Sequence, residues 1–191
     1  MLEKFFGRLM VRAGGVQQTG VELNAIWRYS FKKIRQSVVL KPSVLMLGLG
    51  AGGALKDLYT LFPGSSITTV EYDPIMVHLA LELQLYKPYP LPKIIEGDAG
   101  DILPTLSENF DLIVIDLFQG SKVSSLISQE SFLTNLKKIL SPRGIILINV
   151  FREPQCLEAA RRIFTHSSHW KYTSNTIGAF WDYSPLTEHS C

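Results

Sequence analysis

The chain has 191 residues, of which 46% are hydrophobic and 19% are charged. This length is enough for one domain with a substantial core and too short for two domains of usual size. The formal net charge of +2 is mild, so composition does not favour nucleic acid or an anionic membrane as a partner. Small-molecule chemistry fits at least as well, and a homodimer is possible.

Cysteine and histidine usage gives no sign of a metal site or a disulfide framework. Cys156 and Cys191 lie far apart, and the four histidines lack ligand spacing. No segment reaches about 18 uncharged apolar residues, and the first ten residues carry charges where a signal peptide would be apolar. We therefore expect a cytoplasmic protein without a bound metal and without a membrane span.

The N-terminal residues 1–20 are expected to form an arm or hairpin, because short apolar segments flank Gly14-Gly15. From residue 21 to about 38, apolar residues recur at three- and four-residue steps, which predicts an amphipathic helix. Its basic face is better explained by solvation than by phosphate binding. We assign residues 21–191 to one domain, with a frayed tail beyond Pro185.

After Pro42, strand-like and helix-like segments alternate, which is typical of a parallel sheet with helices on both faces. The last two predicted strands are joined by only three residues, so they should be antiparallel. Asp73 before Pro74 predicts a helix start, and residues 141–144 are expected to end a helix and turn into a strand. The predicted strands are 44–47, 66–71, 93–96, 110–116, 144–150, 169–173 and 177–183, and the helices after Pro42 are about 53–61, 74–86, 101–106, 128–140 and 154–166.

These segments predict a single doubly wound, Rossmann-like α/β domain. Its sheet would have seven strands, mostly parallel, with one antiparallel strand. In such a sheet, ligands bind outside the carboxyl ends of the strands. Four consecutive predicted strands end in residues suited to ligand binding: the glycine-rich segment Gly48, Gly50 and Gly52, then Glu71, then Asp98-Ala99, then Asp116.

The glycines alone also satisfy the loose pattern of a dinucleotide site. A dinucleotide gives a reason for Glu71, about twenty residues on, but none for Asp98 and Asp116. An adenosyl ligand gives a reason for each: Glu71 would accept from the ribose hydroxyls, Asp98 from the adenine amino group, and Asp116 would lie near the reactive end. Tyr72 would pack on the adenine, and we assign Asp101 as the N-cap of the short helix that follows.

The order of these motifs resembles a known family. The segments GxGxGG, VEYDP, GDA and IVIDLF, followed by an antiparallel terminal hairpin, are similar to class I S-adenosylmethionine-dependent methyltransferases, and more narrowly to their spermidine synthase-like branch. The resemblance covers about residues 42–150. It implies the class I methyltransferase fold, with S-adenosylmethionine or its decarboxylated form as cofactor. Ala99 is then counted with the cofactor-binding residues.

Two positions depart from the aminopropyltransferases of that branch. Where their glycine-rich loop usually carries an aspartate for the amine of the decarboxylated cosubstrate, this chain has Ala51. Where their fourth-strand motif ends in an aspartate that helps to hold the polyamine, this chain has Gln119. The resemblance implies that Asp116 is the retained proton acceptor. Gln18, in a segment similar to one that precedes the family's core, and Gln119 are the candidates to bind the substrate.

We therefore expect a spermidine synthase-like methyltransferase that acts on a small-molecule acceptor, with Asp116 as the catalytic base. One alternative is aminopropyl transfer to a polyamine, which Asp116 favours and Ala51 and Gln119 oppose. A second alternative is a module that binds an adenosyl ligand without catalysis. The Asn/Asp-Pro-Pro-Tyr element of enzymes that methylate amino groups on bases is absent from the sequence, which disfavours a nucleic-acid base as acceptor.

Overall fold

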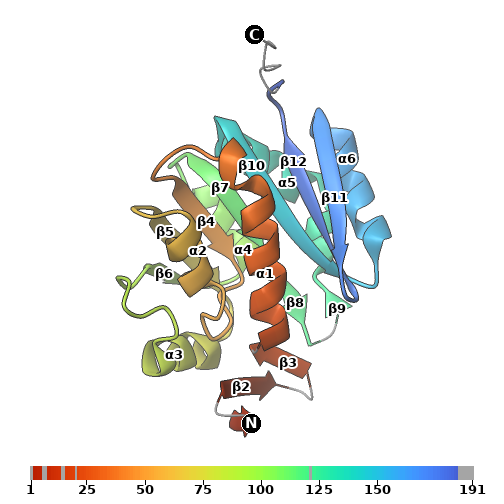
Figure 1. Cartoon of the computed structure of the whole chain (residues 1–191). Helices are drawn as coiled ribbons and strands as arrows, with labels where there is room; N and C mark the ends of the chain where they lie inside the picture. The colour runs from red at the N-terminus through yellow and green to blue at the C-terminus, as the bar shows by residue number, and fades with distance from the viewer. Residues whose placement is uncertain (1, 6–7, 14–15, 20, 121, 185–191) are drawn as a thin grey trace.

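The computed structural model describes residues 2–5, 8–13, 16–19, 21–120 and 122–184, with side chains from residue 25 onwards. The main sheet has seven strands in the order β11-β12-β10-β7-β4-β5-β6 (Figure 1). Neighbouring strands from β6 to β10 are parallel, and β12 is antiparallel to both of its neighbours. The predicted fold class is therefore confirmed. The strands are β4 (Ser43–Leu47), β5 (Ser66–Glu71), β6 (Lys93–Glu96), β7 (Phe110–Ile115), β10 (Leu140–Phe151), β11 (His166–Tyr172) and β12 (Asn175–Trp181).

Helices cover both faces of this sheet because the buried strands are apolar on both sides. Val44 and Met46 of β4 pack with the residues of α1 and α2, while Leu45 and Leu47 of the same strand pack with those of α4, α5 and α6. The helices are α1 (Val21–Ile34), α2 (Leu55–Leu61), α3 (Pro74–Leu83), α4 (Ala99–Ile102), α5 (Glu130–Lys138) and α6 (Glu158–Ile163), with single 3₁₀ turns at Arg35–Ser37, Leu103–Thr105, Ser125–Ser128 and Pro154–Leu157.

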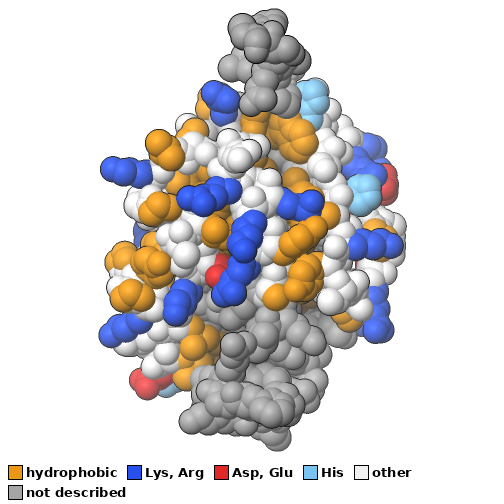
Figure 2. Space-filling view, viewed as in Figure 1, with side chains coloured by type: hydrophobic (Ala, Val, Ile, Leu, Met, Phe, Trp, Pro, Cys, Tyr) orange, Lys and Arg blue, Asp and Glu red, His pale blue; other side chains and the backbone are white. Residues whose placement is uncertain are grey.

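Helix α1 is amphipathic, as its sequence period predicts. Trp27 and Phe31 are buried and stacked on each other, whereas Arg28 and Lys32 are exposed. Figure 2 shows lysine and arginine side chains spread among apolar ones over this face of the molecule. Arg28 is held by Asp57 of α2, with 2.8 Å between its Nε and the carboxylate Oδ1. The basic side of the helix thus faces solvent and helps to fix α1 against α2.

The predicted turn at residues 141–144 is wrong, because these residues already belong to β10. Pro142 and Arg143 are exposed, and the register of β10 against β7 shifts between Leu140 and Ile145. A bulge lets the strand include a proline without losing a buried ladder hydrogen bond. Gly144 fits here because a Cβ would lie 3.0 Å from the carbonyl oxygen of Phe110.

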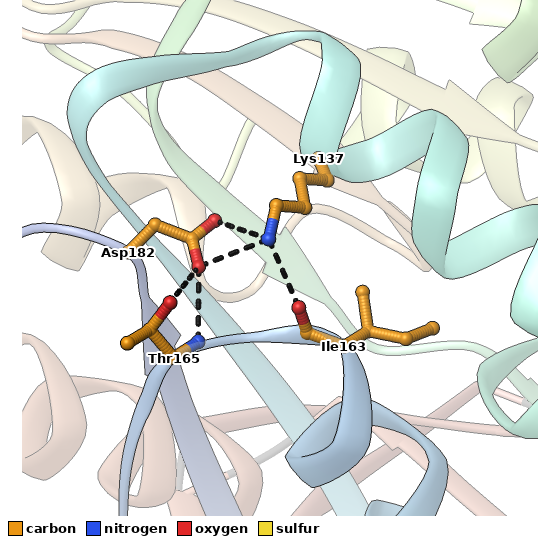
Figure 3. A network of polar contacts seen from close by, with 4 residues as sticks. All are labelled: Lys137, Ile163, Thr165 and Asp182. Atoms are coloured by element: carbon orange, nitrogen blue, oxygen red, sulfur yellow. Dashed lines mark hydrogen bonds and ion pairs between the residues drawn. The ribbon is translucent and has the colours of Figure 1, made fainter.

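A polar network ties the second helical layer to the antiparallel hairpin (Figure 3). Lys137 of α5 donates to the carbonyl oxygen of Ile163 at the end of α6 and forms an ion pair with Asp182, which follows β12. Asp182 also accepts from the amide and the hydroxyl of Thr165, both at 2.9 Å. These contacts fix the β11–β12 hairpin to the layer formed by α5 and α6.

The N-terminal residues form a small antiparallel sheet of β1 (Leu2–Phe5), β2 (Arg8–Ala13) and β3 (Val16–Thr19), from which the chain continues into α1. The turn residues Gly14-Gly15 and the tail beyond Pro185 lie outside the described residues. In Figure 1 this sheet lies at the end of the molecule where α1 begins, together with α3 and a short hairpin of β8 (Phe118–Gln119) and β9 (Lys122–Val123). The parallel strands end at the same side.

Candidate functional site

The glycine-rich loop packs directly on the chain that leaves β7. Gly48 has φ +88°, and a Cβ built on it would lie 2.3 Å from the carbonyl oxygen of Asp116. Only glycine permits this backbone approach. The Gly48 amide donates to the carbonyl of Val70 on β5, so the loop is tied to the strands on both sides of β4.

Glu71, at the end of β5, holds the loop in place from the other side. Its Oε2 accepts from the amides of Leu49 at 2.9 Å and Gly50 at 2.7 Å, and its Oε1 accepts from the amide of Asp73 at 3.0 Å. A carboxylate has about four acceptor positions, and three are used here. Glu71 is only partly buried, so it retains capacity for a further donor such as a ribose hydroxyl.

Asp98, at the end of β6, is the N-cap of α4. Its Oδ1 accepts from the amide of Gly100 at 2.7 Å, so the assignment of Asp101 as the cap is wrong. The reason is that α4 begins at Ala99, two residues earlier than expected, which places Asp101 within the first turn. Asp98 remains partly exposed, and among the described residues no hydrogen bond reaches its Oδ2. The side chain of Ala99 is buried in the core beneath α4, so its predicted contact with a cofactor would have to be made by its backbone.

Asp116 follows β7 directly, and both of its carboxylate oxygens accept hydrogen bonds. The indole Nε1 of Trp27 donates to Oδ2 at 2.9 Å, and Nδ2 of Asn149 donates to Oδ1 at 2.8 Å. Burial raises the pKa of Asp116 above its ordinary value, the hydrogen bonds from Trp27 and Asn149 oppose this rise, and the nearby Glu71 carboxylate adds to it. The side chain is still partly accessible. Asp116 is thus a carboxylate suited to accept a proton nearer neutral pH than a free aspartate would.

Sequence reasoning missed the partners of Asp116. The indole N–H of the buried Trp27 reaches across 89 positions of sequence to the carboxylate. A buried tryptophan usually finds an acceptor, and this was the available signal. Asn149 is a single polar residue in the apolar segment 145–150, and it accepts in turn from Nδ2 of Asn175 on β12 at 2.8 Å.

The other predicted residues are distributed around this centre. Tyr72 is 71% exposed beside Glu71, where a planar ligand could pack on it. Gln119 is exposed in the β8–β9 hairpin, three residues after Asp116. Gln18 lies in β3, and its side chain is outside the described part of the molecule. Ala51 is buried and packs with Met76 of α3.

The strand order brings the main candidates together along one edge. Asp116 of β7, the glycine-rich loop of β4, Glu71 of β5 and Asp98 of β6 follow neighbouring strands in that order. Three carboxylates beside a close-packed backbone loop suit a ligand with hydroxyls, an amino group and a positive charge, which are the groups of an adenosyl sulfonium. Within the described ranges, no group of three or more histidine, cysteine or acidic side chains could hold a metal ion. No described helix is long and apolar enough to cross a membrane.

This sheet, with its glycine-rich loop and strand-end acids, defines a class I S-adenosylmethionine-dependent methyltransferase fold. A family model described as a methyltransferase domain matches residues 45–148, which is more than half of the chain. The chain therefore belongs to this methyltransferase family, with a relationship to spermidine synthases, and we describe it as an S-adenosylmethionine-dependent transferase.

Relatives carry two kinds of name. A polyamine aminopropyltransferase of Vibrio vulnificus is 28% identical over 111 residues, covering 56% of this chain and 37% of the relative. An eEF1A lysine and N-terminal methyltransferase homolog of Drosophila pseudoobscura pseudoobscura is 27% identical over 166 residues, covering 80% of this chain and 23% of the relative. The chain thus spans less than half the length of these curated relatives.

Human methyltransferase-like protein 13, solved in complex with SAH, has the same fold. Its structure superposes with a TM-score of 0.70 at 20% identity, covering 90% of this chain and 86% of that one. The likeness extends beyond the segment matched by the family model to nearly the whole described domain.

Proposed function

We propose that this chain transfers a methyl group from S-adenosylmethionine to an aliphatic amine of a small molecule. The observation that carries the proposal is Asp116, a partly accessible carboxylate at the end of β7, oriented by two neutral donors and lying next to the glycine-rich loop. The acceptor chemistry is suggested by the names of the relatives. Polyamines, lysine side chains and protein N-termini all present an amine.

S-adenosylmethionine supplies an electrophilic methyl group on a sulfonium, so the protein chiefly has to align the reactants and remove a proton. An aliphatic amine is protonated at neutral pH and must lose a proton before its lone pair can attack. Each carboxylate oxygen of Asp116 uses one acceptor position for Trp27 or Asn149 and keeps another for the incoming ammonium. A raised pKa makes Asp116 a better match to neutral pH as the acceptor of that proton.

Two observations favour methyl transfer over aminopropyl transfer. Ala51, at the position where an aspartate would bind the cosubstrate amine, is 1% exposed and packed with Met76, so negative charge is missing there. Gln119, at the position of the second polyamine-binding aspartate, is exposed and neutral. Of the two fourth-strand acids of the aminopropyltransferases, a dicationic polyamine would therefore find only Asp116 here.

A protein amine is the second candidate acceptor. It is favoured by the relatives named as lysine and N-terminal methyltransferases, whose similarity covers 80% of this chain, against 56% for the aminopropyltransferase. The two candidates share the same site chemistry and differ only in the size of the acceptor. The two candidate acceptors are therefore distinguished by whether the transferred methyl group is found on a small molecule or on a protein.

The test combines ligand binding with a search for the methylated product. Calorimetry would rank S-adenosylmethionine, its decarboxylated form and the demethylated product as ligands, and S-adenosylmethionine with a labelled methyl group would be incubated with cell extract. Label in the small-molecule fraction supports the proposal, and label in protein supports the second candidate. Tighter binding of the decarboxylated form would favour aminopropyl transfer. Binding of S-adenosylmethionine without transfer of the label would favour a binding module, and no binding of any of these ligands would overturn the site.

Asp116→Asn is the matching variant. It should bind S-adenosylmethionine with an affinity within about threefold of the wild type, but lose at least about a hundredfold in turnover, the scale of a general base. Glu108→Gln, which changes an exposed acid paired with Lys93 away from this edge, is the control and should keep both properties. Equal turnover in Asp116→Asn would refute its assignment as the base.

A further inference from the structure

Two buried amides form a chain that ends on Asp116. Asn175 of β12 donates through Nδ2 to Oδ1 of Asn149 on β10, and Asn149 donates through Nδ2 to Oδ1 of Asp116, each at 2.8 Å. Asn149 is 1% exposed and Asn175 is 7% exposed. These hydrogen bonds therefore link three neighbouring strands, β12, β10 and the end of β7, through the interior of the sheet.

The sheet itself gives no reason for these amides. The residues around Asn149, from Ile145 to Val150, are apolar and buried, and an apolar side chain would fill its place without the cost of burying an amide. A buried polar group is retained at low cost only when it is hydrogen-bonded, and both amides here make hydrogen bonds. The two hydrogen bonds follow one another, and the second ends at the carboxylate of Asp116.

The sequence of hydrogen bonds also fixes which end of the Asn149 amide faces Asp116. An asparagine amide has a donor end and an acceptor end, and a rotated Asn149 would turn its oxygen toward the carboxylate. Because Asn175 donates to Oδ1 of Asn149, the donor end of Asn149 is the one that faces Asp116. Trp27 approaches the other oxygen from α1, so the carboxylate is held from both sides.

We propose that Asn149 and Asn175 are positioning residues that orient Asp116 and keep it ionised for proton transfer. The effect of the two asparagines on catalysis rests on the proposed function. Their effect on the orientation and ionisation of Asp116 does not. Among the described residues, the charged group that acts on Asp116 is Glu71, and Trp27 and Asn149 are neutral donors. Loss of Asn149 therefore removes a donor while leaving the repulsion from Glu71.

The test measures the titration of Asp116 directly, by NMR of carbon-13-labelled aspartate carboxyls in the full chain without ligand, with Asp116→Asn to assign the signal. Asn149→Leu should raise the pKa of Asp116 by about one unit, the size expected for loss of one hydrogen bond to a carboxylate. Asn175→Leu, which only frees the Asn149 amide to rotate, should raise it by less. Thr69→Val changes a buried polar residue of the same sheet that makes no hydrogen bond to Asn149, Asn175 or Asp116, and it should not change the pKa of Asp116.

The same variants carry the catalytic readout. In Asn149→Leu the acid limb of the pH–rate profile for methyl transfer should move up by the same amount, so the rate falls about tenfold at a pH below both pKa values. If Asn149 had only a structural role, its loss would lower the midpoint of thermal unfolding and leave the titration of Asp116 unchanged. Thr69→Val gives the comparison for such a loss of stability. An unchanged titration in both Asn149→Leu and Asn175→Leu overturns the inference. A shifted titration without methyl transfer to any acceptor would overturn only the proposed function.

Discussion

The indole N–H of Trp27 donates to the carboxylate of Asp116 at 2.9 Å, joining the first long helix to the end of the central strand β7. The tryptophan is 2% exposed and stacked on Phe31, so it is both a core residue and the partner of a candidate base. This dual position means that the stability and the activity of the protein are coupled through one side chain.

Trp27→Phe should separate these two roles. The change keeps a stacked aromatic ring but removes a hydrogen bond to a charged group, which costs about 1.5–3 kcal/mol of unfolding free energy. It should also raise the pKa of Asp116 further. A raised folded-state pKa means that stability falls as the pH rises from the unfolded-state value through the folded-state value, so the loss should be larger at pH 7 than at pH 3. Urea unfolding at both pH values measures this.

The matched control is Trp170→Phe. The Trp170 indole donates at 3.0 Å to the hydroxyl of Ser30, a neutral acceptor on the same helix. This variant should lose about 0.5–1.5 kcal/mol at pH 7, with no change in turnover. A Trp27→Phe protein as stable and as active as the Trp170→Phe protein would contradict the role given to the indole of Trp27.

Glu71→Gln tests whether the strand-end carboxylate organises the loop. The carboxylate accepts three backbone amides, and an amide side chain can offer only one oxygen to them. We expect S-adenosylmethionine affinity to fall at least tenfold, measured by calorimetry, with a lower midpoint of thermal unfolding. Glu96→Gln, at the exposed end of the neighbouring strand β6, should bind as the wild type does. Unchanged affinity in Glu71→Gln would remove the basis for a ribose site here.

Ala51→Asp and Gln119→Asp test whether this protein can accept the two acids that aminopropyltransferases carry at these positions. Ala51 is buried beside Met76, so an aspartate would have to be neutral or displace α3, and we expect a loss of about 2 kcal/mol or more. Gln119 is exposed, and Gln119→Asp should stay within about 0.5 kcal/mol of the wild type. Urea unfolding gives both values. A stable Ala51→Asp protein that uses the decarboxylated cosubstrate would show that the loop can still take an aminopropyltransferase form.

Asp182→Asn tests the network of Figure 3. Burial alone would raise the pKa of Asp182, but hydrogen bonds from Thr165 and Lys137 hold it below its ordinary value of 3.8. A lowered folded-state pKa stabilises the protein above the unfolded-state value, and this stability is lost as the pH falls through the folded-state value. Because Lys137 is 41% exposed, we expect only about 1 kcal/mol at pH 7. The difference between wild type and variant should shrink below about pH 4, and a constant difference from pH 7 to pH 2 would argue against the ionic contribution.

The sequence was sufficient to predict the sheet because most of its strands contain apolar runs and β4, β5, β6 and β7 end at or next to a glycine or an acid. The same logic placed Gly48, Glu71, Asp98 and Asp116 on one edge, since carboxyl ends of parallel strands lie together. Local signals were less reliable at element ends. Asp98, three residues before the predicted cap Asp101, caps α4, and a proline-containing segment that reads as a turn is a bulge in β10.

The hydrogen-bond partners of Asp116 could not be predicted in the same way. They come from α1 and β10, at 89 and 33 positions away in the sequence, and no local pattern specifies which buried polar group faces which. Such pairings follow from strand order and side-chain direction together. They become visible only once the sheet is assembled.

The close fit of Gly48 against Asp116 has a mechanical meaning. With the glycine at the contact and the amide of Asp116 donating to the carbonyl of Leu47, the glycine-rich loop and Asp116 are held together through their backbones. Neither can shift without carrying the other. Under the proposed function, the distance from S-adenosylmethionine to the proposed proton acceptor, Asp116, is therefore set when the chain folds.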